Sequence, residues 1–339
     1  MSSAASRIAR LTGLSVRDAR VVGSQHGYQH LMLTLAGGQR AFAKALPTTP
    51  DQAARIGDTA DGPPGASDQV AAAFAAEANG LRWLAEVKAV PVPRVLAVTE
   101  GALVVSMIQP GRATPEAAFQ FGADLARLHG AGADGFGAPW PGFIASLPLD
   151  NTLTRADMQP WPQWYAARRL VPYLRPAVDS GALRPEDARP VEAVIDRIDS
   201  LAGPAEPPSR IHGDCWAGNV LWSAGRGWLI DPAAHGGHRE TDLAMLALFG
   251  ATFASQAIVH VSPMSFYRGI TSGLLGFSDV ANGLAKSIVF GLVIGLSSCH
   301  FGITTKGGAP GVGRSVNATV VASAAGIFVL DYLVSFLLG

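Results

Sequence analysis

The sequence predicts an α+β fold with two lobes, an antiparallel sheet plus a helix followed by a mostly helical lobe, and an appended hydrophobic helical tail. Apolar residues alternate along the early chain, as in half-buried strands, and later segments show helical periodicity. After about residue 250 the charged residues are few, namely Arg268, Asp279, Lys286, Lys306, Arg314 and Asp331. We therefore expect lobes over 1–110 and 111–254 and the tail over 255–339.

The first lobe is predicted to contain strands on both sides of one helix. Residues 16–46 alternate in polarity and include a hairpin turn at Gly37-Gly38. Residues 47–68 are rich in Pro, Gly, Asp and Ala, which indicates an exposed loop. A helix is expected over 69–88, because its apolar residues recur at helical spacing and prolines follow it. Two further strands are expected over 95–98 and 102–108.

The second lobe is predicted to be helical, with short strands around a polar motif. A helix is expected over 115–130, and another helical stretch over 161–203 with interruptions at Pro172 and Pro176. The strands are expected at 220–222 and 228–230, joined by a turn at 225–227. Another helix is expected to begin at Leu243.

Composition excludes several classes of protein. The 26 basic and 26 acidic residues balance, so no nucleic-acid partner is expected. Cys215 and Cys299 are the two cysteines, which argues against a disulfide framework or a structural zinc site and fits a reducing compartment. Residues 1–14 lack the apolar core of a signal peptide.

The segment His212-Gly-Asp-Cys-Trp-Ala-Gly-Asn219 carries the strongest chemical signal. Phosphoryl transfer needs a carboxylate that accepts the proton of the attacking hydroxyl, and Asp214 suits this catalytic role. Asn219 follows five residues later and Asp231 follows a short hairpin, and both offer the oxygen ligands that Mg²⁺ prefers. An Asp-x4-Asn spacing with a later Asp is the arrangement of protein-kinase catalytic and metal loops.

Residues of the first lobe are candidates for binding ATP. Lys44, on a strand after a hairpin, can reach the phosphates, and Glu77, on the following helix, can hold Lys44 in place. The remaining candidates for cofactor binding are Gly23, Gly27 and Met107. His212 and Asp242 are predicted to support the catalytic loop rather than to contact a substrate.

Residues 16–250 resemble the fructosamine (ketosamine) kinases, relatives of the aminoglycoside phosphotransferases with a protein-kinase-like fold. The most specific matches are His212–Asn219 and Ile230-Asp-Pro-Ala-Ala-His-Gly-Gly-His-Arg-Glu-Thr-Asp-Leu-Ala-Met245. The resemblance implies ATP- and Mg²⁺-dependent phosphorylation of a hydroxyl on a ketosamine, that is deglycation of a glycated amine, in the cytoplasm. It also implies that Trp216, His235, His238 and Glu240 lie near the substrate. Cys215 departs from the family's usual Leu.

The tail resembles the end of an MlaE-type permease of lipid-transporting ABC systems. Its most specific string is Gly307-Gly-Ala-Pro-Gly-Val-Gly-Arg314, between uncharged runs at 287–303 and 316–330. Two membrane-type helices within 287–338 would tether the kinase to the inner or plasma membrane, whereas two buried helices would complete a soluble lobe. Because the two resemblances imply conflicting topologies, the chain reads as a join of two unrelated pieces. A permease fragment with a kinase-like extension and an inactive truncated kinase are the alternative functions.

Overall fold

A computed structural model describes residues 3–25, 27–47, 66–144 and 147–247, with isolated positions at 293, 297, 300, 315, 318, 319, 323 and 326. The chain divides into two compact units, Met1–Ala251 and Thr252–Gly339. The expected lobe over 1–110 falls within the first unit, as does the lobe expected over 111–254 except for its last three residues. The predicted apolar runs of the tail lie outside the described residues apart from isolated positions. Within the described ranges, no helix combines the length and apolarity needed to cross a membrane.

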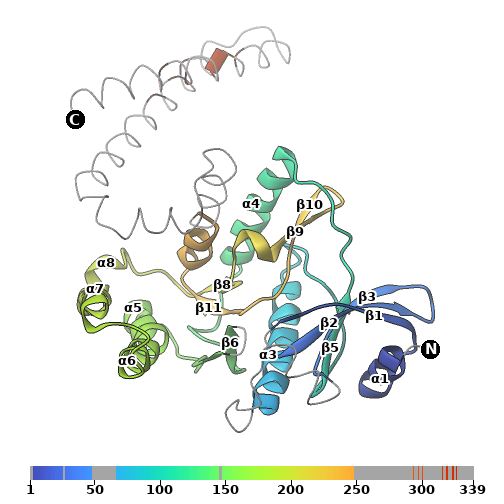
Figure 1. The fold of residues 1–339 in the computed structure, drawn as a ribbon. Coiled ribbons are helices and arrows are strands. Elements are labelled where there is room, and N and C mark those ends of the chain that lie inside the picture. Colours follow the sequence, from blue (N-terminus) through green and yellow to red (C-terminus); the bar gives the residue numbers. More distant parts are fainter. Residues whose placement is uncertain are drawn as a thin grey trace. The chain divides into compact units, whose positions relative to one another are not determined.

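The first lobe is an antiparallel five-stranded sheet with strand order β1-β2-β3-β5-β4 (Figure 1). Its strands are β1 (Val16–Gln25), β2 (Tyr28–Leu35), β3 (Arg40–Ala45), β4 (Val95–Thr99) and β5 (Ala102–Ser106). The helix α3 (Ala66–Glu86) lies between β3 and β4 in the chain, so the predicted order of strands and helix is confirmed. Residues 48–65 of the expected loop lie outside the described residues.

The two faces of the sheet pack against different helices. Ala41, Ala43 and Ala45 of β3 belong to the core that includes Ile8 of α1 (Ser3–Thr12), a helix that sequence reasoning missed. Phe42, one position out of step, packs with Phe74 of α3 instead. Since side chains alternate along a strand, Lys44 lies on the same face as Phe42, toward α3. The period of two thus places a lysine opposite Glu77.

The second lobe consists of helices and short antiparallel pairs. The expected helix at 115–130 is confirmed as α4 (Pro115–Gly130), whose N-cap residue Thr114 accepts a hydrogen bond from the backbone N–H of Ala117. The antiparallel pairs are β6 (Gly142–Ile144) with β7 (Leu147–Leu149), β8 (Ser209–Ile211) with β11 (His235–Gly237), and β9 (Val220–Ser223) with β10 (Arg226–Leu229). The turn between β9 and β10 is Ala224-Gly225, one residue earlier than expected, with positive φ at both positions.

The helical stretch at 161–203 is interrupted elsewhere than predicted. α5 (Trp161–Tyr165), a π-helical turn at Ala166–Leu170 and α6 (Val171–Asp179) run on without a break. Pro172 lies in the first turn of α6, where a missing N–H is tolerated, and Pro176 lies inside that helix. The break falls instead before α7 (Pro185–Asp196) and α8 (Ile198–Leu201), at Gly181, which has a φ of +72°.

Candidate active site

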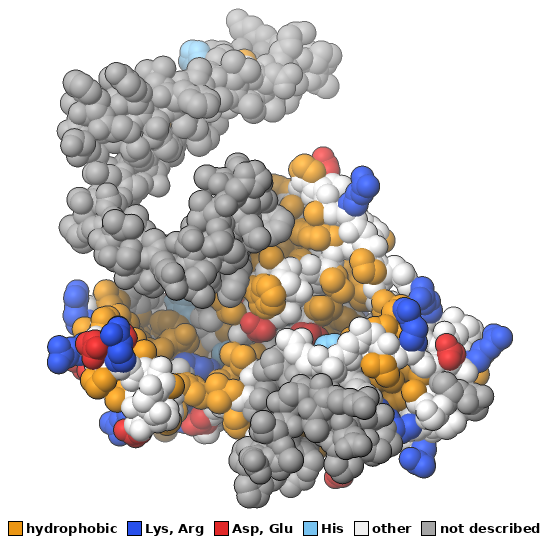
Figure 2. Space-filling model, in the orientation of Figure 1, with side chains coloured by type: hydrophobic (Ala, Val, Ile, Leu, Met, Phe, Trp, Pro, Cys, Tyr) orange, Lys and Arg blue, Asp and Glu red, His pale blue; other side chains and the backbone are white. Residues whose placement is uncertain are grey.

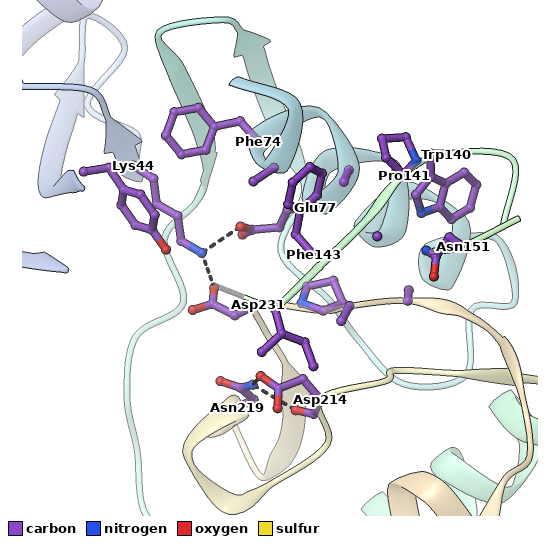
Figure 3. A pocket seen from close by; sticks show the side chains of 18 of the residues that line it. Lys44, Phe74, Glu77, Trp140, Pro141, Phe143, Asn151, Asp214, Asn219 and Asp231 are labelled. Atoms are coloured by element: carbon purple, nitrogen blue, oxygen red, sulfur yellow. Dashed lines mark hydrogen bonds and ion pairs between the residues drawn. The ribbon is translucent and has the colours of Figure 1, made fainter. Parts of the chain in front are cut away.

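A cavity of about 350 Å³ lies between the two lobes, at the residues predicted to carry out the chemistry. Its lining includes Lys44, Glu77, Asp214, Trp216, Asn219 and Asp231. Figure 3 shows Lys44 reaching from the sheet and Glu77 from α3, with Asp231, Asp214 and Asn219 on the loops facing them. In Figure 2 most visible Lys and Arg side chains lie toward the edges of the face, whereas acidic side chains occur both at the edges and near the middle.

Lys44 is held between two carboxylates. Its Nζ lies 2.7 Å from Glu77 Oε2 and 2.9 Å from Asp231 Oδ1. Burial alone would lower the pKa of Lys44, but Glu77 and Asp231 outweigh it and raise that pKa above its ordinary value. Burial raises the pKa of Glu77 to about 7, and the neighbouring Asp231 acts in the same direction against the opposing Lys44. Lys44 therefore carries its positive charge throughout the physiological pH range.

The desolvated setting of Asp231 would by itself raise the pKa of its carboxyl group, but Lys44 holds that pKa below the ordinary value. The Asp231 side chain is 46% exposed, and Oδ1 is bonded to Lys44. Its backbone φ of +53° lies in the left-handed region, which Asp tolerates better than most residues. This local conformation directs an ionised carboxylate into the cavity at the end of the β9–β10 hairpin.

Asp214 and Asn219 form a pair across the catalytic loop. Asn219 Nδ2 donates to the Asp214 backbone oxygen at 2.9 Å and to Asp214 Oδ2 at 2.8 Å. The amide nitrogen of Asn219 is thus bonded to Asp214, so Asn219 Oδ1 is the atom of this side chain that can serve as a ligand of a cation. Burial raises the pKa of Asp214, against the opposing effects of His212 and Asn219. A carboxyl group with a raised pKa is a better proton acceptor once ionised.

The residues present fit a magnesium ion. No group of three or more His, Cys, Asp or Glu side chains that could hold a metal occurs among the described residues. Mg²⁺ is commonly held by one or two protein oxygens together with water and substrate phosphates. Asn219 and Asp231 line the same cavity and offer such oxygens, so they suit a metal shared with a phosphate group.

His212 and Asp242 hold the loop from behind. The buried carboxylate of Asp242 accepts hydrogen bonds from the backbone N–H of His212 at 2.8 Å and of Gly213 at 2.9 Å, and from His129 Nε2 at 2.9 Å. His212 Nε2 donates to the Ile230 backbone oxygen at 2.9 Å, and the Ile230 N–H donates to the Asn219 backbone oxygen at 3.0 Å. These bonds fix the loop of Asp214 to the strand end that carries Asp231.

The other predicted site residues lie elsewhere. Gly23, Gly27 and Met107 are not among the described lining residues of the cavity, although Gln25, Tyr28 and His30 of the same hairpin are. His235, His238 and Glu240 are likewise not among them. His235 is 5% exposed and stacks on Trp164, with ring centroids 5.9 Å apart. His238 is 7% exposed and packs against Trp161.

Sequence reasoning missed one wall of the cavity. Trp140, Pro141, Gly142, Phe143 and Ile144 line it, together with Asn151. They belong to β6 and the segments that flank the β6–β7 hairpin, and Figure 3 shows Trp140 and Asn151 well apart from Lys44. A short hairpin of three-residue strands carries too little periodicity to reveal its position from sequence.

Acid destabilisation is expected from His235. Burial lowers the pKa of His235 to about 4, so the folded protein keeps this ring neutral while the unfolded chain takes up a proton below about pH 6.5. Stability is therefore fully present above that pH and falls by about 3 kcal/mol as the pH drops to about 4. Urea denaturation at several pH values should show a flatter dependence for His235→Gln than for the wild type. Equal slopes in the two proteins would contradict the assignment.

Comparisons with known proteins identify a family for most of the described chain. Residues 66–265 match the family model of fructosamine kinase. Over 206 residues the chain is 32% identical to a protein of Synechocystis described as a probable ketoamine kinase, and over 186 residues 37% identical to one of Thermus thermophilus. These alignments cover 59% and 55% of this chain and span 64% of each relative's length.

Solved structures show the same fold. A provisionally assigned fructosamine-3-kinase from Thermobifida fusca superposes with a TM-score of 0.62 at 46% identity, covering 74% of this chain and 79% of that one. Another from Haemophilus somnus, at 18% identity, gives a TM-score of 0.54 over 78% of this chain and 80% of that one. The fold is kinase-like, and Lys44, Glu77, Asp214 and Asp231 line one cavity in it. Since the family model matches more than half of the chain, the protein belongs to the fructosamine kinase family.

The C-terminal part matches a second family. Residues 243–337 match the model of the permease MlaE, which overlaps the kinase match at 243–265. A stretch of 57 residues is 47% identical to the Arabidopsis thaliana protein TRIGALACTOSYLDIACYLGLYCEROL 1, of which it covers 16%. The chain thus matches the models of two families, as the two sequence resemblances predicted.

Proposed function

We propose that this protein transfers the γ-phosphoryl group of ATP to a hydroxyl group of a ketosamine, with Mg²⁺ as the metal ion. The observation that carries the proposal is that Asp214, Asn219, Asp231 and Lys44 line one cavity between the lobes. Membership of the fructosamine kinase family supports the choice of acceptor. The alignments span only 64% of the length of each of these relatives, so the activity of this chain does not follow from theirs and is proposed here.

Each residue has a defined task in the proposed reaction. The Asp214 carboxylate orients the acceptor hydroxyl and takes its proton as the oxygen attacks the γ-phosphorus and the bond to the β,γ-bridging oxygen breaks. Lys44 leaves its contact with Asp231 and binds the phosphates, while Glu77 keeps the ammonium group of Lys44 in place. When bound by Asn219 and Asp231, Mg²⁺ supplies positive charge to the phosphate oxygens. Asp242 and His212 keep Asp214 in register with Asp231.

The full-length chain is expected to convert ATP to ADP in proportion to a fructosamine acceptor, and only when Mg²⁺ is present. Mass spectrometry should find a phosphorylated acceptor, and EDTA should abolish its formation because Asn219 and Asp231 alone cannot neutralise the phosphates. Underivatised fructose and the free amine are the matched controls. Folded protein that forms no phosphorylated acceptor would show that this chain is an inactive kinase fold.

The match at 243–337 supports a second candidate function, that of a component of a lipid-transport permease. This reading predicts that the full chain fractionates with membranes and co-purifies with an ABC-type ATPase subunit. Recovery of the full chain in the supernatant without such a subunit would count against it, and the kinase assay on the same material separates the two readings.

A further inference from the structure

The cavity wall that has no role in the proposed reaction contains a buried polar side chain, that of Asn151. Asn151 lines the cavity and is 4% exposed, so its amide group is almost fully removed from bulk solvent. A buried amide normally satisfies its hydrogen-bonding groups. Asn151 Oδ1 accepts a hydrogen bond from Arg169 Nη2 at 2.6 Å. No described residue accepts a hydrogen bond from Nδ2, so its two N–H groups are available to a ligand in the cavity.

Arg169 is fixed on three sides, so it sets the orientation of the Asn151 amide. Its guanidinium lies over the ring of Trp164, 4.5 Å from the centroid, and its Nη1 donates to the Asp150 backbone oxygen at 2.6 Å. Burial lowers the pKa of Arg169 to about 10, which still leaves the group charged at neutral pH. A charged donor on Oδ1 rules out the flipped amide, because that rotamer would set N–H against N–H.

Trp164 is itself clamped behind this wall. It is fully buried between Arg169 and the ring of His235, and its Nε1 donates to the Thr152 backbone oxygen at 3.3 Å. His235 therefore lies behind the wall, as a support for Trp164 and Arg169. On the cavity side, Gly142 makes room for the amide, since a Cβ there would lie 2.7 Å from Asn151 Cγ.

We propose that Asn151 is a specificity-determining residue of the acceptor subsite, where its Nδ2 donates a hydrogen bond to a hydroxyl oxygen of the sugar part of the ketosamine. Arg169 is the positioning residue that fixes this donor. The inference rests on the proposed function for the identity of the acceptor. Figure 3 shows Asn151 on the side of the cavity away from Lys44, so the donor addresses the acceptor and not the phosphates bound by that lysine. Trp140 lines the same wall, and an indole ring suits the C–H face of a sugar.

The decisive variant is Asn151→Asp. It keeps the size of the side chain and gains an ion pair with Arg169, so folding is preserved, but the donor becomes an acceptor. We expect kcat/KM for the fructosamine to fall by about 10- to 100-fold, as for a lost hydrogen bond in a buried site, with the KM for ATP unchanged. Asn79→Asp is the matched control, because Asn79 also accepts from an arginine, Arg82, on the exposed face of α3 outside the cavity.

A series of monodeoxy fructosamines identifies the hydroxyl involved. For one analogue the wild type should lose about as much as Asn151→Asp does, and the variant should lose nothing further on that analogue. The proposal would be overturned if, for every analogue, the loss in kcat/KM from the missing hydroxyl added to the loss from Asn151→Asp. An equal fall in kcat/KM for the control variant would also overturn it. Arg169→Met should show the same dependence on the analogue, with a smaller effect, seen in the KM for the acceptor. A thermal melt confirms that this variant folds.

Binding of the fructosamine without ATP, measured by calorimetry, separates this inference from the proposed function. Wild-type protein that binds the acceptor but never phosphorylates it would contradict the kinase activity, while weaker binding by Asn151→Asp would still support the subsite. Equal binding by the two proteins would overturn the subsite even if the wild type is an active kinase.

Discussion

Asp214→Asn is expected to lower kcat for acceptor phosphorylation by a factor of about 10² to 10⁴, because the proton of the attacking hydroxyl loses its acceptor. The substitution keeps an oxygen that can accept from Asn219 Nδ2, so the loop geometry should survive. Since burial raises the pKa of Asp214, the acid limb of the kcat/KM profile should lie above the ordinary range of an aspartate. Steady-state rates between pH 5 and 9 check both expectations.

Asp134→Asn is the matched control for this experiment. Asp134 is exposed and is not among the described lining residues of the cavity, so its loss should leave kcat unchanged. An Asp214→Asn protein with the wild-type melting temperature and a kcat within tenfold of the wild type would show that another group accepts the proton.

Asp242→Ala is expected to lower the free energy of unfolding by about 3 to 5 kcal/mol, as when one partner of a buried polar network is removed. Asp242 is fully buried, and its loss leaves the N–H groups of His212 and Gly213 and the ring of His129 without their acceptor. Loss of these bonds should also loosen the loop that carries Asp214. Urea denaturation at pH 7 measures the effect on stability.

The same carboxylate should contribute to acid sensitivity. Although burial would raise the pKa of Asp242, its hydrogen bonds from His129 and His212 hold that pKa below the ordinary value in the folded protein. Its contribution is therefore present above the unfolded-state pKa of about 4 and is lost as the pH falls through the lower folded value. Asp157→Ala, at an exposed pair with Arg155, should leave the urea midpoint nearly unchanged. A similar midpoint for Asp242→Ala would contradict the supporting role.

The positions of cavity residues could be predicted from sequence where they depend on local spacing. Asp214 and Asn219 lie on one loop and Asp231 closes the next hairpin, so their shared cavity follows from short-range chain geometry. The pairing of Lys44 with Glu77 follows from strand alternation and the helix after it. The helix break predicted at Pro172 and Pro176 was misplaced. Pro172 follows a π-helical turn and lies in the first turn of α6, where a proline costs little.

The two-lobed α+β fold, the family, and the carboxylates and lysine that line the cavity could all be predicted from sequence, since these features reside in short motifs and in periodicity. The tertiary structure decided which of the remaining residues face the cavity. It placed His235 behind Trp164 and brought Asn151 to the wall, because burial and side-chain direction depend on contacts between segments far apart in the chain. The hold of Lys44 on Asp231 is likewise such a contact, made between residues of different lobes.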